Sequence, residues 1–429
     1  MDKVYKNIRD LASFLDLFRR KTDKPSHEER FYSTGLYPNQ YSGLTSSSSG
    51  QIISKDTALR ISSVWSCIRV ISETIASLPI SLYEKDTNDK RVTLLNNPLH
   101  TLISEQPSSL YDSFSFFERI LVDLCLDGNF YAYIERNSGG LPTQIIPIQC
   151  NDVDVYVSPD GREVYYEINQ NEVIPYPYTG KVASINMLHI KGMSTDGVVG
   201  KSPIESAAES LGISLSIEKY AGSFYKNSAT VGGILSHPGT LKPETAKRLR
   251  ASWNQTYSGS INAGKTAILE EGMQFIPRSI PNNQAQFLET RQYQVSDIAR
   301  IFRVPNHMIN DLSKISYSSI EAQQIDFVVH TITPWIKRIE TALNQKLVPV
   351  KQKGKQYFKF NLTALLRGDS KTRADYYRTL VNIGVLSPDE VRKFEDLNSM
   401  GGASESVYMQ SNMMPLDDLG TATTRADLE

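Results

Sequence analysis

Two long stretches of helical periodicity follow one another in the second half of the sequence, and they constrain the fold of the chain more than any other feature. Apolar residues recur at spacings of three and four through residues 284–304 and again through residues 319–347. At 1.5 Å per residue these helices would be roughly 30 Å and 40 Å long. Pro305 ends the first pattern, whereas the second continues on both sides of Pro334, which predicts a kink there. Taken alone, the pair is typical of a helical hairpin in a protein core.

The composition is that of an ordinary soluble protein. A chain of 429 residues suggests about three domains. The formal net charge is only −1, whereas a protein that coats nucleic acid usually carries a marked excess of basic residues. If this chain meets DNA, we expect it to do so without gripping it.

The cysteines and the apolar runs indicate the compartment. Cys67, Cys125 and Cys150 are too few and too scattered for a disulfide framework and lack zinc-binding spacing, so we expect buried thiols in a reducing compartment. No apolar run approaches the ~18 residues of a membrane span. The first residues carry interrupted charges rather than the apolar stretch of a signal peptide. We therefore expect a protein that is made in the cytoplasm and has no membrane partner.

The first half of the chain predicts helices that carry a small sheet. Helical spacing runs from residue 57 to Pro79, and a second helix covers residues 113–127. Alternating segments separated by turn sequences predict mostly antiparallel strands, at residues 80–83, 130–136, 143–147, 153–157, 164–168 and 187–191. The Ser-rich stretch at residues 42–50 is typical of a loose linker. The alternative for this end of the chain is an arm that becomes ordered against a neighbouring subunit.

The second half predicts an α/β insertion between long helices. A helix over residues 203–227 is followed by a strand, a helix over 243–257 and two short strands, and then by the helix over 284–304. Residues 357–365 alternate as a strand, and two short helices follow at 370–383 and 388–397. The tail from Gly401 has no periodicity, and we expect it to be loose.

Gly200-Lys201-Ser202 is the one motif that suggests an enzyme. A phosphate-binding loop needs a further glycine five positions before Gly200, where this chain has Thr195. Pro203 follows the serine directly, as it would at the first turn of a helix capped by Ser202. The motif therefore favours a helix cap over a nucleotide site, although a degenerate nucleotide-binding enzyme remains the alternative.

No other motif points to catalysis or to a cofactor. The histidines are spread along the chain without metal-binding spacing. A nucleophile elbow and a dinucleotide fingerprint are both missing from the sequence. We expect no catalytic residues, no metal and no cofactor.

Several segments, in a fixed order, resemble the portal proteins of tailed bacteriophages, in the short form typical of phages with long non-contractile tails. They include VWSCIRVISETIASLPISLYE, NPLHTLISEQPS, LDGNFYAYIERN, DGVVGKSPIESAAESL, GKTAILEEGMQFIPRSIPNNQAQFLETRQYQVSDIARIFRVPNHMIN and YSSIEAQQIDFVVHTITPWIKRIETALNQKL. The resemblance covers about residues 57–397. It implies an α+β portal-type fold, with long stem and tunnel helices, that assembles as a ring, typically of twelve subunits.

The resemblance also implies a division of the chain. The parts would be a flexible arm (1–56), the first part of a wing (57–202), stem helix 1 (203–227), an α/β clip (228–282), stem helix 2 (283–305), a tunnel loop (306–318), the tunnel helix with the rest of the wing (319–368), a small helical crown (369–400) and a loose tail (401–429).

Two sets of candidate site residues follow from that division. The tunnel loop, which would face the DNA channel, contributes Asn306, His307, Asn310, Asp311, Ser313, Lys314, Ser316, Tyr317 and Ser318. The charges of Asp311 and Lys314 cancel, which suits a channel that lets DNA slide, because each phosphate that is neutralised adds to a salt-dependent grip. The clip helix carries a basic surface suited to an acidic partner, formed by Lys242, Lys247, Arg248 and Arg250. An ordinary solvated helix face would explain these residues equally well.

The expected function is a non-enzymatic DNA conduit at one capsid vertex of a virion. Its expected partners are further copies of itself, the large terminase subunit, the major capsid and scaffold proteins, a head-completion or tail adaptor protein, and double-stranded DNA read without sequence specificity. It would serve procapsid assembly, terminase docking, genome packaging, retention and ejection, and the joining of head and tail. Another capsid-associated connector ring is a further alternative.

Overall fold

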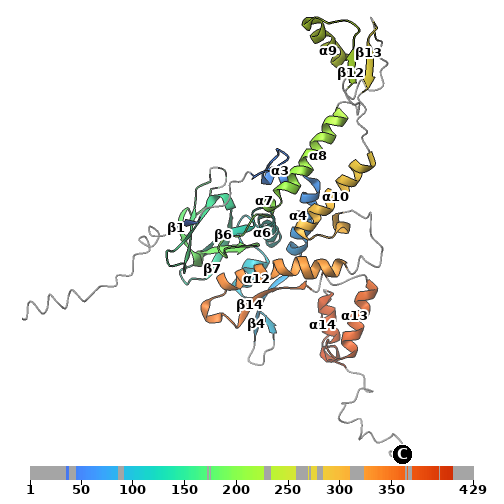
Figure 1. Cartoon of the computed structure of the whole chain (residues 1–429). Helices are drawn as coiled ribbons and strands as arrows, with labels where there is room; N and C mark the ends of the chain where they lie inside the picture. The colour runs from blue at the N-terminus through green and yellow to red at the C-terminus, as the bar shows by residue number, and fades with distance from the viewer. Residues whose placement is uncertain are drawn as a thin grey trace, which may run out of the picture. The chain divides into compact units, whose positions relative to one another are not determined.

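The computed structural model describes residues 35–37, 45–85, 91–171, 173, 175–226, 233–257, 269, 272–277, 284–309, 323–362, 365, 370–395 and 397–408. Figure 1 shows the elements in chain order from blue to red. Helices and antiparallel strands are mixed, as the α+β prediction requires. The chain divides into a larger unit, residues 1–313 with 330–360, and a smaller unit, residues 314–329 with 361–429.

Two helices form the centre of the larger unit. Helix α4 (Ser62–Ala76) packs against α6 (Ser113–Asp127), and both bury continuous apolar faces that include Ile71 and Phe116. The helix expected from residue 57 is broken in two, because α3 (Lys55–Leu59) has its own capping box and Ile61 is extended and buried before α4 begins. Helix α5 (Pro98–Ser104) packs on the neighbouring strand β4.

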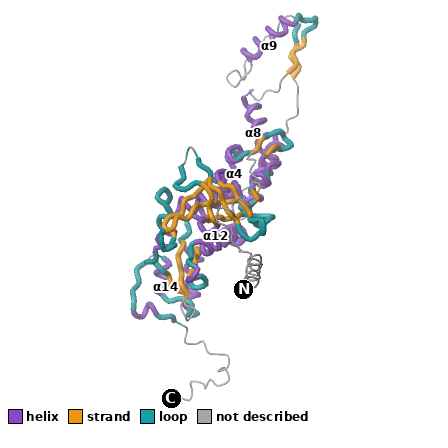
Figure 2. Tube along the Cα trace, turned by 90° about the vertical axis from the view of Figure 1, so that its left-hand side faces the viewer, coloured by secondary structure: helices purple, strands orange, loops and turns teal. Residues whose placement is uncertain are grey.

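The strands form several antiparallel sheets rather than a single one. One sheet has the order β14-β4-β5, another β11-β6-β7 and a third β1-β8-β9-β10. The bounds are β1 Gly35–Tyr37, β4 Ile80–Lys85, β5 Arg91–Thr93, β6 Asn129–Arg136, β7 Pro142–Ile148, β8 Val153–Val157, β9 Val164–Ile168, β10 Gly180–Ala183, β11 Met187–Lys191 and β14 Gln356–Phe360. Short 3₁₀ turns at Cys150–Asp152, Ser184–Asn186 and Val350–Gln352 link neighbouring elements. Figure 2 shows these strands in orange with α12 alongside.

Part of the segment expected to be a loose arm is ordered structure. Strand β1 pairs with β8, and β2 (Thr45–Ser46) pairs with β3 (Ile52–Ile53) in a hairpin. The backbone N–H of Ser48, in the hairpin turn, donates to the Glu209 carboxylate at 3.1 Å. The Ser-rich composition predicted a loose linker for this stretch. Composition alone cannot show that Glu209, which is 161 positions away in the sequence, accepts a hydrogen bond from it.

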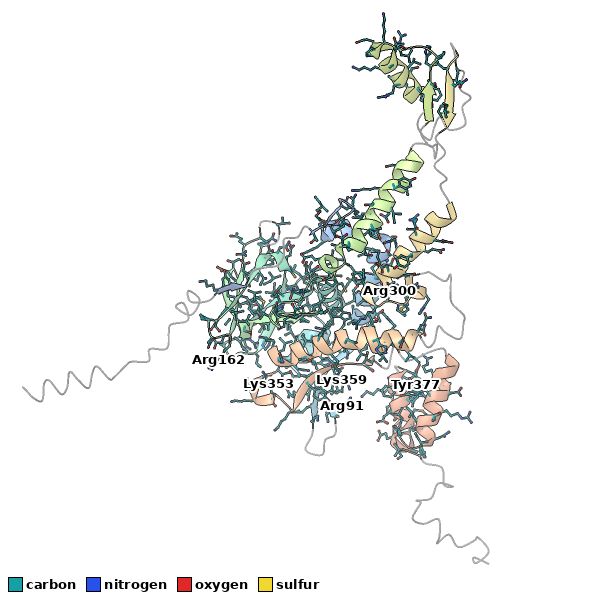
Figure 3. All side chains as sticks on the ribbon, viewed as in Figure 1. Arg91, Arg162, Arg300, Lys353, Lys359 and Tyr377 are labelled. Carbon is teal, nitrogen blue, oxygen red and sulfur yellow. The ribbon has the colours of Figure 1, made fainter. Side chains whose placement is uncertain are left out.

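Two long helices run beside each other next to α4. The helix expected at 203–227 is interrupted at Ala207, giving α7 (Pro203–Ser206) and α8 (Ala208–Lys226). Helix α10 (Gln284–Phe302) packs on both α4 and α8. Ser214 of α8 donates a hydrogen bond to Gln294 of α10 at 2.7 Å. Figure 3 labels Arg300 of α10, which pairs with Asp297 at 3.0 Å one turn earlier.

Two further segments complete the larger unit. Strands β12 (Gly233–Ser236) and β13 (Gln274–Pro277) pair antiparallel beside α9 (Pro243–Tyr257). After the 3₁₀ turn Asn306–Ile309, the described chain resumes at residue 323 within the smaller unit and returns to the larger unit at His330. This stretch contains the π-helical turn Val328–Ile332 and α12 (Thr333–Lys346). Helix α12 packs on β11 and β14 and buries Ile336, Ile339 and Leu343.

The smaller unit contains two short helices. Helices α13 (Ser370–Asn382) and α14 (Pro388–Phe394) are separated by Gly384, whose φ is 72°. Tyr377, labelled in Figure 3, donates to the Glu395 carboxylate at 2.9 Å. The Asp389 carboxylate accepts the backbone N–H groups of Met400 and Gly401, and a 3₁₀ turn follows at Gly402–Glu405. The start of the segment expected to be a loose tail is therefore structured.

Candidate functional site

Gly200-Lys201-Ser202 lies where three backbone segments cross. A Cβ atom on Gly200 would lie 2.0 Å from the carbonyl oxygen of Gly128, and a Cβ on Gly128 would lie 2.1 Å from that of Lys201. Gly128 ends α6 in the left-handed conformation with φ 72°, and its carbonyl accepts the N–H of Gly192 at 2.7 Å. Glycines are needed here because no side chain fits between the crossing strands and the helix end.

The polar groups of this crossing are used inside the protein. The Gly200 N–H donates to the Asn129 side-chain oxygen at 2.6 Å, and the Lys201 N–H donates to the Met193 carbonyl at 2.7 Å. Ser202 caps α7 and donates to the Leu126 carbonyl at 2.6 Å. A phosphate-binding loop needs backbone N–H groups that point at the phosphate. Because these N–H groups already have partners, the geometry supports the cap prediction and not the nucleotide-binding alternative.

A buried histidine joins the same crossing to the sheet of β11. His189 lies 3.1 Å from the Asn129 amide oxygen through Nε2 and 3.1 Å from the Tyr166 hydroxyl through Nδ1, and it stacks on Tyr131. Burial holds the pKa of His189 well below its usual value, so the ring is neutral at pH 7. From the sequence, His189 was considered only as a possible metal ligand, and its position in an apolar strand was the only signal for the buried role that it has here.

Two carboxylates are buried on α6. Asp123 accepts from Arg119 at 2.8 Å, and Asp127 pairs with Lys55 at 2.5 Å. Burial raises the pKa of Asp123 to about 6 against the lowering effect of Arg119. Each carboxylate is matched by one cation, which is what burying a charge requires. The Lys55–Asp127 ion pair therefore links α3 to α6, whereas Arg119 and Asp123 pair within α6.

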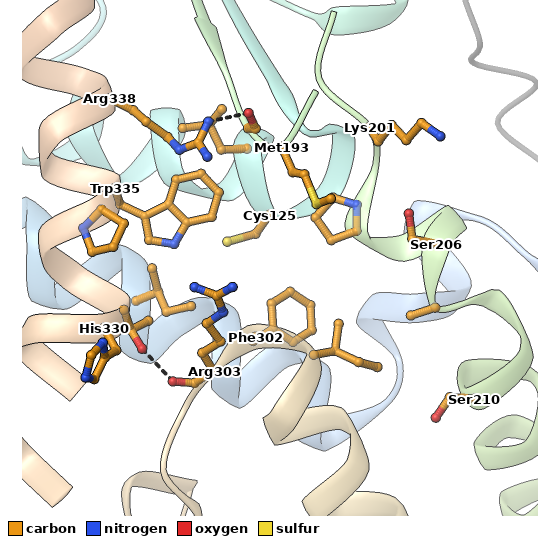
Figure 4. Close-up of a pocket in the computed structure, with 18 of the residues that line it drawn as sticks. Cys125, Met193, Lys201, Ser206, Ser210, Phe302, Arg303, His330, Trp335 and Arg338 are labelled. Carbon is orange, nitrogen blue, oxygen red and sulfur yellow. Dashed lines mark hydrogen bonds between the residues drawn. The ribbon is translucent and has the colours of Figure 1, made fainter. Parts of the chain in front are cut away.

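An open cleft of about 700 Å³ lies among α4, α6, α7, α8, α10 and α12 (Figure 4). Its apolar wall includes Ile71, Leu124, Met193, Pro203, Phe302 and Trp335. Arg338 crosses the face of Trp335 at 5.8 Å and donates to the backbone carbonyls of Lys191 and Gly192. The sequence analysis did not predict this cleft, because its lining comes from segments up to 267 residues apart (Ile71 to Arg338).

Arg303 lies at the floor of the cleft, just after α10. Its N–H donates to the Arg300 carbonyl at 3.2 Å, and the N–H of Val304 donates to the Ala299 carbonyl at 2.9 Å. This pair of bonds is the Schellman pattern, in which the residue after the helix takes a left-handed conformation, usually as glycine. Arg303 takes it with φ 56°, and among the described residues no other non-glycine residue has a positive φ. Thr331 donates to its carbonyl at 2.6 Å.

Neither a metal site nor a membrane helix is found in the part of the chain that the structure describes. No group of three His, Cys, Asp or Glu side chains there is placed to hold a metal ion. No described helix is both long and apolar enough to cross a membrane. The three cysteines are buried and unpaired with one another, as predicted.

Residues 62–396 match the family model for phage portal proteins. The chain belongs to the phage portal protein family. It is 31% identical over 373 residues to the portal protein of Enterobacteria phage HK97, a match that covers 86% of each chain.

Solved structures share the fold of this portal-family chain. An HK97-family phage portal protein from Corynebacterium diphtheriae superposes with a TM-score of 0.54 at 17% identity, over 72% of this chain and 95% of that one. A chain from the neck of a native gene transfer agent particle, computed with C12 symmetry, superposes with a TM-score of 0.53 at 20% identity, over 83% and 96%. The predicted family and fold are therefore confirmed.

The predicted tunnel-loop residues fall mainly outside the described residues. Asn310, Asp311, Ser313, Lys314, Ser316, Tyr317 and Ser318 all lie there. Asn306 and His307 are described in the 3₁₀ turn after α10, where Asn306 donates to Ser296 at 2.9 Å. Pro334 stands in the first turn of α12, directly after the π-helical turn. Proline has no N–H to donate, and a π turn is one way to accommodate it inside a helix.

The predicted clip cations do not share one face of α9, because Lys247, Arg248 and Arg250 are spread around the helix and Lys242 precedes it. Lys242, Lys247, Arg248 and Arg250 are all exposed. Trp253, near the end of α9, stacks on Phe275 of β13 with 5.6 Å between the ring centroids. The helix therefore packs on its own strand pair through Trp253, and the four cations remain exposed.

Proposed function

We propose that this chain is one subunit of a ring of about twelve copies that forms the DNA channel at one vertex of a virus capsid. The observation that carries the proposal is the family match over residues 62–396. The twelvefold number is supported by the C12 symmetry of the neck structure whose chain shares this fold. As a ring subunit, the chain resides in the virion after being made in the host cytoplasm.

The paired helices α8 and α10 support a stem that carries a clip. They lie side by side, and the β12–α9–β13 segment is inserted between them in the sequence. Its exposed cations, Lys242, Lys247, Arg248 and Arg250, suit an acidic surface of the packaging motor or, later, of a tail adaptor protein. Lysine and arginine side chains give such a contact its steering and its salt dependence.

The conduit needs no ATPase activity of its own. The N–H groups of Gly200 and Lys201 are bonded within the chain, so phosphate would have to break those bonds to enter. ATP hydrolysis then belongs to the large terminase subunit. The ring itself nucleates the procapsid with capsid and scaffold proteins, passes and retains DNA, and releases it through the tail.

Electron microscopy of the purified full chain, negatively stained, tests the ring. We expect end-on views of closed rings with a central hole, and a particle mass of about twelve times the 48.2 kDa of one chain. Monomers at the highest soluble concentration, also after co-expression with the scaffold protein, would contradict the proposal.

Substituting Lys314→Glu in the tunnel loop tests its contact with DNA. A ring of glutamates would repel passing phosphates, so we expect slow or stalled packaging with normal ring assembly. The measurement is DNA protected from nuclease in an in vitro packaging reaction, with ring assembly followed by microscopy. Packaging at the normal rate would place the loop away from DNA.

A further inference from the structure

Arg303 has a left-handed backbone conformation, which is unfavourable for any residue that carries a side chain. At φ 56° it occupies the position after a helix where glycine fits without strain. A left-handed backbone costs an ordinary residue about 1 kcal/mol, and such residues are commonly retained for what their side chains do. The side chain of Arg303 is therefore the feature to explain.

The guanidinium of Arg303 projects into the cleft. Figure 4 shows it between Trp335 and Phe302, among the residues that line the cleft. The residue is exposed, and the structure gives its side chain no hydrogen bond or ion pair with any described residue. Lys201, on the rim, is also exposed and has no such side-chain partner among the described residues.

The two acidic residues that line the cleft, Glu209 and Asp297, form their hydrogen bonds and ion pairs with residues other than Arg303 and Lys201. The Glu209 carboxylate accepts the backbone N–H and the hydroxyl of Ser48. The Asp297 carboxylate accepts from Ser210 and pairs with Arg300. The cleft thus combines an aromatic and aliphatic wall with two cations that have no side-chain partner among the described residues, which fits a partner that brings apolar side chains and a carboxylate.

We propose that this cleft receives an apolar, carboxylate-bearing surface of a neighbouring copy of this chain, and that Arg303 anchors it. The proposal rests on the ring proposed above and names one contact within it. Aromatic, methionine and arginine side chains in an open pocket are the groups that dominate protein interfaces. In a closed ring the same cleft recurs on each subunit and faces one neighbour.

Nucleic acid fits this cleft less well than protein does. A phosphate backbone would pass over Glu209 and Asp297 as well as over the two cations. Much of the wall is apolar, and a phosphate backbone offers nothing to bury against it. A carboxylate on an apolar surface satisfies both parts of the lining.

Replacing Arg303 with glycine distinguishes the effect of this residue on the stability of the single chain from its effect on ring assembly. Arg303→Gly relieves the backbone and removes the guanidinium, so we expect the unfolding temperature of the dilute, unassembled chain to rise by roughly 2 °C. We expect the concentration needed for half-assembly to rise at least about tenfold, as measured by mass photometry. Arg303→Lys keeps the positive charge, so its half-assembly concentration should lie between those of the unchanged chain and of Arg303→Gly.

Arg162→Gly is the matched control, because Arg162 is an arginine whose side chain is 84% exposed in the β8–β9 turn. It should leave assembly unchanged. Unchanged assembly of Arg303→Gly would overturn the proposal, and so would an equal loss in both variants. A lower unfolding temperature in Arg303→Gly would mean that the arginine serves the fold, which also overturns it.

Photocrosslinking identifies what occupies the cleft. Ser206 lines the cleft and is exposed, so Ser206→Cys can carry a benzophenone maleimide, and the buried native cysteines should stay unlabelled. Isotopically light and heavy copies are mixed, assembled and irradiated. We expect light–heavy crosslinks in the ring fraction, at peptides that bear acidic and apolar residues.

The outcomes separate this contact from the ring itself. Rings whose crosslinks stay within one copy would overturn the cleft proposal and leave the ring standing. A complete absence of rings would overturn the proposed function. Salt-dependent binding of duplex DNA to the unassembled chain that is lost in Arg303→Gly would assign the cleft to nucleic acid and overturn the protein contact.

Discussion

The helices α6 and α10 both end on a left-handed residue, but they end for different reasons. Gly128 follows α6 with φ 72° and has the backbone of Lys201 against it. Arg303 follows α10 with φ 56° and has an open cleft beside it. The first end has room for glycine alone, because two other segments cross it. The second end would accept glycine and carries arginine instead. A helix end that holds the fold together can thus be told from one that presents a side chain.

The largest expected effect is at the crossing behind α6. Gly128→Ala adds the left-handed penalty of about 1 kcal/mol and places a Cβ atom 2.1 Å from the Lys201 carbonyl oxygen. We expect a loss of at least about 3 kcal/mol in the free energy of unfolding. Denaturant unfolding followed by circular dichroism measures it.

Gly140→Ala is the control for this substitution. Gly140 has φ 79° and nothing within 4 Å of an added Cβ, so only the backbone penalty applies, about 1 kcal/mol. Equal losses in the two variants would show that the close crossing contributes nothing, and the distinction between the two helix ends would fail.

A smaller effect, which depends on pH, is expected at His189 in the same crossing. Burial lowers its pKa in the folded chain, so below pH ~6.5 the unfolded chain binds a proton that the folded chain does not. Stability should therefore fall by up to about 1.4 kcal/mol per pH unit as the pH drops.

His189→Gln should remove that part of the slope. Asp123, whose pKa is raised to about 6, contributes in the opposite sense but equally in both proteins. The measurement is the denaturant midpoint at several pH values between 5 and 8. Parallel curves for the two proteins would mean that the histidine takes up its proton in the folded chain.

The smallest expected effect on the single chain is a gain at Arg303. Arg303→Gly should raise the free energy of unfolding by about 0.5–1 kcal/mol, the reverse of the sign expected for Gly128→Ala. Unfolding in denaturant at a concentration below that of assembly measures it. A destabilised variant would mean that the arginine is held by contacts within its own chain.

Local patterns predicted most of the elements, because helical and strand spacing is local. They overestimated continuity: the helix expected from residue 57 is divided before α4, and the one expected at 203–227 is divided at Ala207. They also predicted Ser202 as a helix cap, because Ser-Pro is a local signal of a helix start.

What the patterns did not predict depends on contacts between distant segments. The crossing of Gly128, Gly192 and Gly200 requires strands and a helix end to meet in space, and no spacing of glycines encodes it. The same holds for the cleft, to which α4 and α12 contribute from opposite halves of the chain. The left-handed Arg303 was missed because arginine gives no turn signal. The tunnel loop, predicted from resemblance, stays a prediction because most of it lies outside the described residues.

A cryo-electron microscopy reconstruction of the assembled chain tests the central claim most directly. The account predicts a closed ring of about twelve copies, as in the C12 neck structure, in which each cleft around Arg303 and Trp335 is filled by density from the adjacent subunit. A chain that remains monomeric contradicts the ring. A ring with solvent-filled clefts contradicts the role assigned to Arg303.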